Sequence, residues 1–148
     1  MNSTPPFKKQ ERPDACAIAC LRMVLAHQDR QVSEAEVVQQ TDLQEGGLEP
    51  AEISRLARLY GLRAVEERLD LTRLTELVNE RRFPIVLLFR RPLDRVDATH
   101  AVIPIRLSRQ YVTFLDPLRG ERRVTIRKFE EARRLVGRWV VVWEPGGP

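Results

Sequence analysis

The sequence predicts an α+β fold, in which a helical N-terminal half packs against a C-terminal antiparallel sheet. Up to about residue 82, most segments carry apolar residues at the spacing of a helix. From residue 83 onward, short runs rich in β-branched residues follow one another, separated by turns. Helices first and strands afterwards is an order typical of α+β proteins. A chain of 148 residues fits one domain over 1–148, and we expect 1–9 and 145–148 to be loose tails.

The first two helices are predicted from composition and from capping residues. Residues 14–27 (DACAIACLRMVLAH) are rich in Ala, Leu and Met, and Asp14, which follows a proline, is placed to cap their first turn. Ser33 followed three residues later by Glu36 is the capping-box pattern, and it opens a helix over 33–41.

The next three elements complete the helical half. A helix begins at Pro50, has apolar residues at helical spacing, and is expected to end at Gly61. Residues 62–68 are a short strand candidate. Asp70 is the expected cap of an amphipathic helix over 71–82.

The second half is predicted to be mainly sheet, with one further helix over 126–136 before the last strand. Its apolar runs have the length and the β-branched content of strands. The predicted strands are 83–89, 100–107, 110–116, 122–126 and 138–143.

Composition and charge exclude several functional classes. The net charge is +4, but the arginines are interleaved with acidic residues, and aromatic residues make up only 6% of the chain. This pattern indicates solvated helix faces rather than a nucleic-acid surface. No apolar run approaches the roughly 20 residues of a membrane span, and no apolar segment follows the first lysines as in a secretory signal. We therefore expect a cytoplasmic protein that binds no nucleic acid.

The two cysteines, Cys16 and Cys20, are four residues apart. On a helix their Cβ atoms would be about 5–6 Å apart, whereas a disulfide needs about 3.5–4.5 Å. Two free thiols fit a reducing compartment. A zinc site built from these cysteines with His27 and His100 would lack the second close ligand pair that such sites usually have. We expect neither a metal nor another cofactor.

Cys16 lies where a helix is predicted to begin, which is a chemically useful place for a nucleophile. The partial positive charge of a helix N-terminus favours a thiolate, and the first N–H groups face whatever the sulfur attacks. The alternative is that Cys16 is a small buried apolar residue. Cys20, one turn further along among apolar neighbours, is interpreted as part of the core.

His100 and Asp116 are the candidates for a base and its orienting carboxylate. His100 begins a predicted strand after a polar loop, and Asp116 ends the next strand before a proline. A hairpin centred at 108–109 would make the two near cross-strand neighbours. A core histidine and a turn-forming aspartate are the alternative interpretations. His27, at the end of a helix, is interpreted as structural.

Taken together, these segments resemble one family, the papain-like peptidases that remove double-glycine leader peptides from bacteriocin precursors. The resemblance covers nearly the whole chain and is carried by QERPDACAIACLRM, by EGGLEPAEISRLARLYGL, and by HAVIPI followed by FLDPLRGERRVTIRKFEEA. The residues that match the family pattern in the first and last blocks are Gln10, Cys16, Ala19, Cys20, Leu21, Met23, His100, Asp116, Pro117, Gly120 and Phe129.

The resemblance implies a papain-like fold with its site in the cleft between the two halves. It implies that Cys16 is the nucleophile, His100 the general base and acid, and Asp116 its orienting residue. Gln10 would stabilise the oxyanion together with a backbone N–H near Cys16. Where the family has an acidic residue before the cysteine and a glycine after it, this chain has Ala15 and Ala17.

The reaction implied is hydrolysis of a peptide bond through a thioester, after small residues such as the Gly-Gly of a leader peptide. The transporter-linked members of the family carry membrane spans and an ATPase. The sequence shows neither of these features, so we expect a free-standing domain, and a transporter is the candidate partner chain. Two alternatives stay open at this point. One is an inactive module on the same fold that binds a leader or another peptide, and the other is a cysteine amidohydrolase or acyltransferase.

Overall fold

The change from helices to strands that the sequence predicts is present in the computed structural model, which describes residues 4–43 and 46–144. The helices are α1 (Cys16–His27), α2 (Glu34–Val38), α3 (Pro50–Leu59), α4 (Leu71–Asn79), α5 (Arg91–Asp94) and α6 (Ile126–Arg134). The strands are β1 (Ala64–Arg68), β2 (Ile85–Phe89), β3 (Thr99–Leu107), β4 (Tyr111–Asp116), β5 (Gly120–Thr125) and β6 (Trp139–Trp143). The predicted α+β class is confirmed.

The strands form one antiparallel sheet whose order differs from the order along the chain. The sheet order is β1-β6-β2-β3-β4-β5, so the last strand, β6, lies between β1 and β2. Strands β2 to β5 are neighbours in chain order. This arrangement ties the strand of the helical half to the sheet of the second half, and it joins the two halves into one body.

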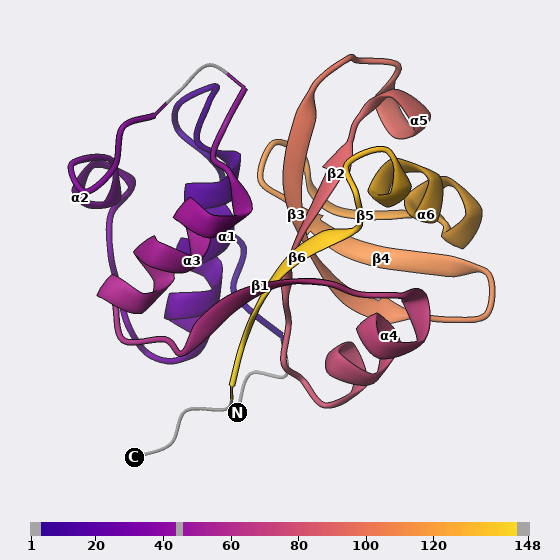
Figure 1. Ribbon diagram of the computed structural model, residues 1–148, viewed down its shortest axis with the longest axis horizontal. Coiled ribbons are helices and arrows are strands. Elements are labelled where there is room, and N and C mark those ends of the chain that lie inside the picture. Colours follow the sequence, from indigo (N-terminus) through magenta and orange to yellow (C-terminus); the bar gives the residue numbers. More distant parts are fainter. Residues whose placement is uncertain (1–3, 44–45, 145–148) are drawn as a thin grey trace.

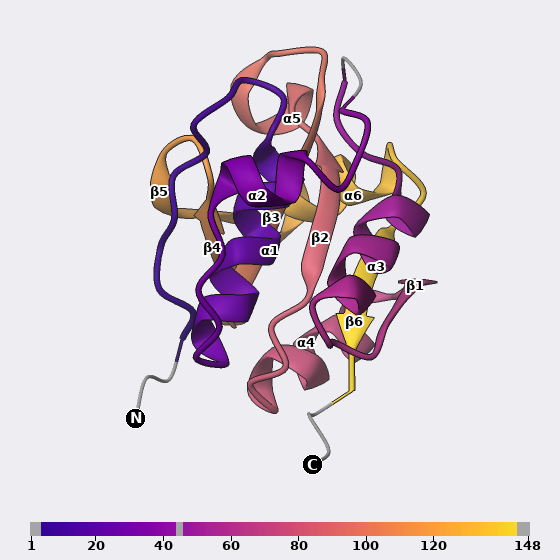
Figure 2. The same ribbon diagram turned by 90° about the vertical axis from the view of Figure 1, so that its left-hand side faces the viewer.

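Helices cover both faces of the sheet. Figure 1 shows α1, α2 and α3 on one side and α5 and α6 on the other. Figure 2 looks onto the first of these sides and shows α2 outside α1. Helix α1 contacts β3 and β2, and α6 contacts β2, β4 and β5. Helix α1 therefore lies against β3, the strand that carries His100.

Side chains of the central strands alternate between two hydrophobic cores, as the pleat of a strand requires. Leu87 and Ile103 pack into the core that includes α1 and α3. Val86 and Val102 pack into the other core, with residues of α4 and α6. Since β2 is covered on both faces, its residues are apolar without alternation, and this explains the run FPIVLLF.

Three predicted N-terminal caps are tested by the structure, and one of them is wrong. Ser33 accepts a hydrogen bond from the N–H of Glu36, and Asp70 accepts one from the N–H of Arg73, as predicted. Helix α1 begins at Cys16 rather than at 14, and its N-cap is Ala15, without a side-chain cap. The carboxylate of Asp14 is instead bound by the guanidinium of Arg12, with Nε 3.2 Å from Oδ1.

Two further segments differ from the sequence prediction. The connection between β2 and β3 contains the short helix α5, which the sequence did not predict. In the predicted N-terminal tail, residues 4–9 form no helix or strand, but Pro5 is buried. The backbone N–H of Gln10 then donates to the carbonyl of Pro117 (3.0 Å), which ties this segment to the turn after β4. Residues 1–3 and 145–148 lie outside the described residues.

None of the helices in 4–43 and 46–144 has the combination of length and apolar content that crossing a membrane requires.

Candidate active site

His100 and Asp116 form a buried hydrogen bond between neighbouring strands. Continuing the β3–β4 register from the pair Ile103–Leu115 places Asp116 opposite Val102, two residues from His100. The side chains span this diagonal, and Nε2 of His100 lies 2.7 Å from Oδ1 of Asp116. The exposed fractions are 4% for His100 and 1% for Asp116. The sequence prediction that the two residues are near cross-strand neighbours is thus confirmed.

Asp116 is held by three donors. Besides His100, the backbone N–H of Leu118 donates to Oδ1 (2.9 Å), and Nη1 of Arg122 donates to Oδ2 (2.9 Å). Burial acts to raise the pKa of Asp116, but the hydrogen bond and charge of His100, with the bonds from Leu118 and Arg122, outweigh it and hold this pKa well below its usual range. The carboxylate is therefore ionised and oriented.

Cys16 and His100 line the same cavity, which has a volume of about 420 Å³. Its wall comes from four parts of the chain, and the lining residues are Arg12, Pro13, Asp14, Cys16, Gly46, Gly47, Arg90, Ala98, Thr99, His100 and Leu118. The helical half thus contributes the thiol and the sheet half the imidazole, as the α+β prediction requires. Because Asp116 engages Nε2, Nδ1 is the ring nitrogen left for Cys16.

The environment of His100 favours its charged form. Burial acts to lower its pKa, but the hydrogen bonds with Asp116 and Cys16 outweigh burial and raise the pKa to about 9. At neutral pH the ring is then an imidazolium. This cation and the first turn of α1, with its partial positive charge, both lie beside Cys16.

Cys20 has a different environment, although it is on the same helix. It is completely buried within the core that α1 and α3 share. Burial, together with the charges of Cys16 and Asp116, raises the pKa of the Cys20 thiol well above its ordinary value. Both cysteines are free thiols. Of the two, only Cys16 is among the residues that line the cavity with His100.

Gln10, the fourth predicted site residue, is buried but is not among the residues that line the cavity. Its amide Nε2 donates to the carbonyls of Arg12 (2.9 Å) and Pro13 (3.1 Å). Its Oε1 is buried without a hydrogen-bond partner. In this structure Gln10 therefore shapes the loop that leads into Cys16.

Three residues near the site were missed by the sequence interpretation. Glu34 is buried, and its carboxylate accepts the backbone N–H groups of Glu11 (2.9 Å) and Arg12 (3.0 Å). Arg122 and Asp94 form an ion pair behind Asp116. Each of the three stands among other charged residues in the sequence, so its local pattern is that of a solvated surface.

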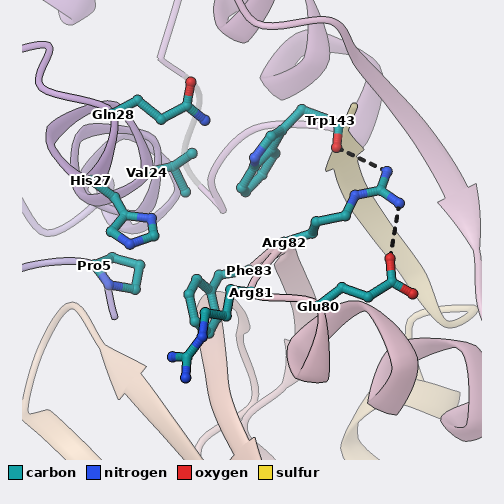
Figure 3. Close-up of a pocket in the computed structure, with 9 residues that line it drawn as sticks. All are labelled: Pro5, Val24, His27, Gln28, Glu80, Arg81, Arg82, Phe83 and Trp143. Carbon is teal, nitrogen blue, oxygen red and sulfur yellow. Dashed lines mark hydrogen bonds and ion pairs between the residues drawn. The ribbon is translucent and has the colours of Figure 1, made fainter. Parts of the chain in front are cut away.

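A second cavity, of about 350 Å³, lies at the other end of α1 (Figure 3). It is lined by His27, whose ring packs edge-on against Phe83 with 5.5 Å between ring centroids. On another wall, Arg82 donates to the carbonyl of Trp143 (3.1 Å). Neither cysteine is among the lining residues. Within the described part of the chain, no cluster of three or more His, Cys, Asp or Glu residues is arranged to hold a metal ion.

The chain is similar to proteins of one family in sequence and in structure. The model of the peptidase C39 family matches residues 4–133. No curated protein shows significant sequence similarity to the chain. Among solved structures, a protein described as a C39-like peptidase from Bacillus anthracis superposes with a TM-score of 0.83 at 18% identity, covering 99% of this chain and 97% of that one.

Two further similar structures are peptidase parts of transporters. A double glycine motif protease from an AMS/PCAT transporter, solved in complex with the leader peptide, has a TM-score of 0.74 and 20% identity, covering 97% of this chain and 94% of that one. The peptidase domain of Streptococcus ComA, a bifunctional ABC transporter of a quorum-sensing pathway, has a TM-score of 0.75 and 17% identity, covering 95% of this chain and 100% of that one. These similarities establish the fold.

Proposed function

The chain belongs to the peptidase C39 family, and we propose that it is a cysteine peptidase in which Cys16, His100 and Asp116 cleave a peptide bond. One observation carries the proposal. His100, whose Nε2 lies 2.7 Å from Oδ1 of the buried Asp116, lines the same cavity as Cys16, which begins α1. A nucleophile, a base and an orienting carboxylate in this order are the requirements of thiol-based acyl transfer.

In the first half of the reaction, the Cys16 thiolate attacks the carbonyl carbon of the scissile bond. The S–C bond forms while the carbonyl electron pair moves onto oxygen. When the electron pair returns and the C–N bond breaks, the His100 imidazolium gives its proton to the leaving nitrogen. The products of this step are a thioester on Cys16 and a free amine.

In the second half, water hydrolyses the thioester. The now neutral His100 accepts a proton from water as its oxygen attacks the thioester carbon, and the C–S bond breaks to return the thiolate and a carboxylic acid. Asp116 keeps the imidazole in one orientation and stabilises its charged form throughout.

Negative charge on the carbonyl oxygen needs donors near Cys16. The first N–H groups of a helix have no partner in a preceding turn, and Cys16, as the first residue of α1, carries one of them. The predicted role of Gln10 as an additional donor would require its Nε2 to release the carbonyls of Arg12 and Pro13. We propose that Gln10 contributes chiefly by fixing this loop next to the cavity.

The substrate is proposed to be a peptide with small residues before the scissile bond. Family membership and the similar structure that was solved with a leader peptide support this proposal. Ala17, which follows the nucleophile, is buried at the start of α1. A methyl group there narrows the space beside the sulfur compared with glycine.

The test is cleavage of a mixture of peptides that carry Gly-Gly, Gly-Ala or Ala-Ala before a common sequence, read by mass spectrometry. We expect cleavage after the small pair by the wild-type protein, and no cleavage by Cys16→Ala or His100→Ala. Cys20→Ala is the matched control, because it removes a thiol from the same helix. Cleavage that persists in Cys16→Ala would contradict the proposal. Binding of peptides without cleavage by the wild type would instead favour the inactive binding module.

A further inference from the structure

Arg122 connects the orienting carboxylate of the site to a second buried carboxylate. Its Nη1 donates to Oδ2 of Asp116 (2.9 Å), and its Nη2 donates to Oδ1 of Asp94 (2.8 Å). The side chains of both aspartates are 2% exposed, and that of Arg122 is 17% exposed. A planar guanidinium can bind two carboxylates at once, each with a fixed direction, which the ammonium of a lysine cannot do.

The sheet and α5 fix Arg122 from two sides. On β5 it pairs with Phe114 of β4, and its guanidinium lies over the Phe114 ring, 5.6 Å from the centroid. Asp94, at the end of α5, also accepts bonds from Nε of Arg90 (3.2 Å) and Nη1 of Arg119 (3.2 Å). Asp94 is thus an anchored acceptor, and Arg122 has little freedom to leave Asp116.

The contacts of Asp116 divide between its two oxygens. Oδ1 accepts from His100 and from the Leu118 N–H, whereas Oδ2 accepts from Arg122. In the described part of the chain, Oδ2 of Asp116 accepts its side-chain hydrogen bond from Arg122. Without that bond, the carboxylate could rotate about its Cβ–Cγ bond and move Oδ1 away from the ring of His100.

We propose that Arg122, anchored by Asp94, is a positioning residue that holds the Asp116 carboxylate in the orientation in which it binds His100. This inference rests on the proposed function, because the positioned group is the carboxylate of the proposed catalytic set. It assigns a role to α5, whose last residue, Asp94, anchors Arg122 behind the site.

Positioning and simple charge have opposite effects on His100. If Arg122 orients Asp116, its removal weakens the Asp116–His100 bond and lowers the pKa of His100. If Arg122 acts only as a nearby positive charge, its removal raises that pKa. The other charged or titratable groups around His100 are Asp116 on β4, Cys16 on α1, and Arg12, Asp14 and Arg90 around the cavity, and none of them is changed in the test.

The experiment is an NMR titration of the imidazole nitrogens in the full chain. The chain has two histidines, so His100 is assigned by comparison with His100→Gln. Arg122→Met removes the hydrogen bonds to both carboxylates. Arg122→Lys keeps the positive charge but cannot bind both carboxylates at once. Asp94→Asn keeps Arg122 but weakens the group that anchors it. Arg119→Met is the matched control, because the Arg119 guanidinium binds Asp94 and not the Asp116 carboxylate, and the substitution keeps the backbone N–H that donates to the Asp116 carbonyl (3.0 Å).

We expect the pKa of His100 to fall by about one unit or more in Arg122→Met and in Arg122→Lys, by less in Asp94→Asn, and not in Arg119→Met. Alkylation of Cys16 by iodoacetamide at pH 7 should slow by about 10- to 100-fold in Arg122→Met, by analogy with metal sites that lose an outer hydrogen-bond partner. Circular dichroism establishes that each variant is folded. If Arg122→Met does not fold, the Lys and Asn variants decide the outcome.

Three results would overturn the inference. They are an unchanged His100 pKa in both Arg122 variants, a raised pKa in Arg122→Met with a normal one in Arg122→Lys, or an equal shift in Arg119→Met. The proposed function fails separately, if Cys16 of the wild type does not react faster than Cys20. The NMR titration reads the Arg122 effect without any substrate, so the two failures are distinguishable.

Discussion

Cys20 lies one helical turn beyond Cys16 on α1, and yet only Cys16 lines the cavity that His100 shares. The two thiols belong to the same residue type, and each follows an alanine in the sequence, as DACA and IACL. The difference lies in the tertiary structure, since the first turn of α1 faces the loop of residues 12–14 and β3, while the second turn is enclosed by the core. This contrast makes the pair an internal control for the proposed mechanism.

The first prediction concerns these two thiols. Cys16→Ala should abolish peptide cleavage and shift the unfolding midpoint little, because it deletes one sulfur atom at the edge of the core. Cys20→Ala should keep most of the activity and cost about 1 kcal/mol of unfolding free energy, since it leaves a small cavity in a closed core. Turnover and thermal unfolding of both variants check this. Equal loss of turnover in the two would mean that the nucleophile is wrongly assigned.

The second prediction concerns stability against pH. The pKa of His100 in the folded protein is about 9, above the ordinary value of 6.5. The stability that its proton contributes is fully present below pH 6.5 and is lost as the pH rises through 9. The free energy of unfolding should therefore fall by on the order of 3 kcal/mol across that range. Urea unfolding at stepped pH measures it, and His100→Gln should flatten the curve. A wild-type curve as flat as that of the variant would show that the His100–Asp116 pair is not formed in solution.

The third prediction concerns Glu34, which holds the backbone of the segment that leads to Cys16. Glu34→Ala leaves the N–H groups of Glu11 and Arg12 without their acceptor, and we expect a loss of about 1–3 kcal/mol in unfolding free energy. Alkylation of Cys16 should slow as well, because the loop forms one wall of its cavity. Glu36→Ala, from the exposed side of the same helix, is the control and should cost less than about 0.5 kcal/mol. Similar losses in the two variants would argue against a role of Glu34 in the loop.

The fourth prediction separates two roles of Gln10. If its amide mainly fixes the carbonyls of Arg12 and Pro13, Gln10→Ala should slow both peptide cleavage and the alkylation of Cys16. If it mainly stabilises an oxyanion, only cleavage should slow, since alkylation forms no oxyanion. We expect both rates to fall, with the larger effect on cleavage. An unchanged alkylation rate would restore Gln10 to the oxyanion role that the sequence predicted.

The sequence predicted those parts of the fold that depend on short segments. The caps at Ser33 and Asp70 are local hydrogen bonds between a side chain and an N–H three residues away, and each has its own pattern. The neighbourhood of His100 and Asp116 follows from one hairpin. Asp14 was misassigned because Arg12, two residues before it, binds its carboxylate in the structure, and a capping pattern does not reveal such competition.

The rest of the site depends on contacts between distant segments. Arg122 meets Asp94 across 28 positions, and Glu34 meets Arg12 across 22. The position of β6 between β1 and β2 is also a long-range feature, for which the run of valines gives no signal. Periodicity and capping patterns act over one or two turns, so they identify the elements but not the charged pairs that these elements bring together.

The measurement that tests the central claim most directly is the rate of alkylation of each cysteine against pH, followed by mass spectrometry in the wild type and in His100→Ala. We predict that Cys16 of the wild type reacts rapidly at pH 6–7, where an ordinary cysteine thiol, with a pKa of about 8.5, is mostly protonated. This advantage should disappear in His100→Ala, and Cys20 should stay unreactive in both proteins. If Cys16 of the wild type is as inert as Cys20 at every pH, no thiolate–imidazolium pair exists, and the account of this site as a peptidase centre is contradicted.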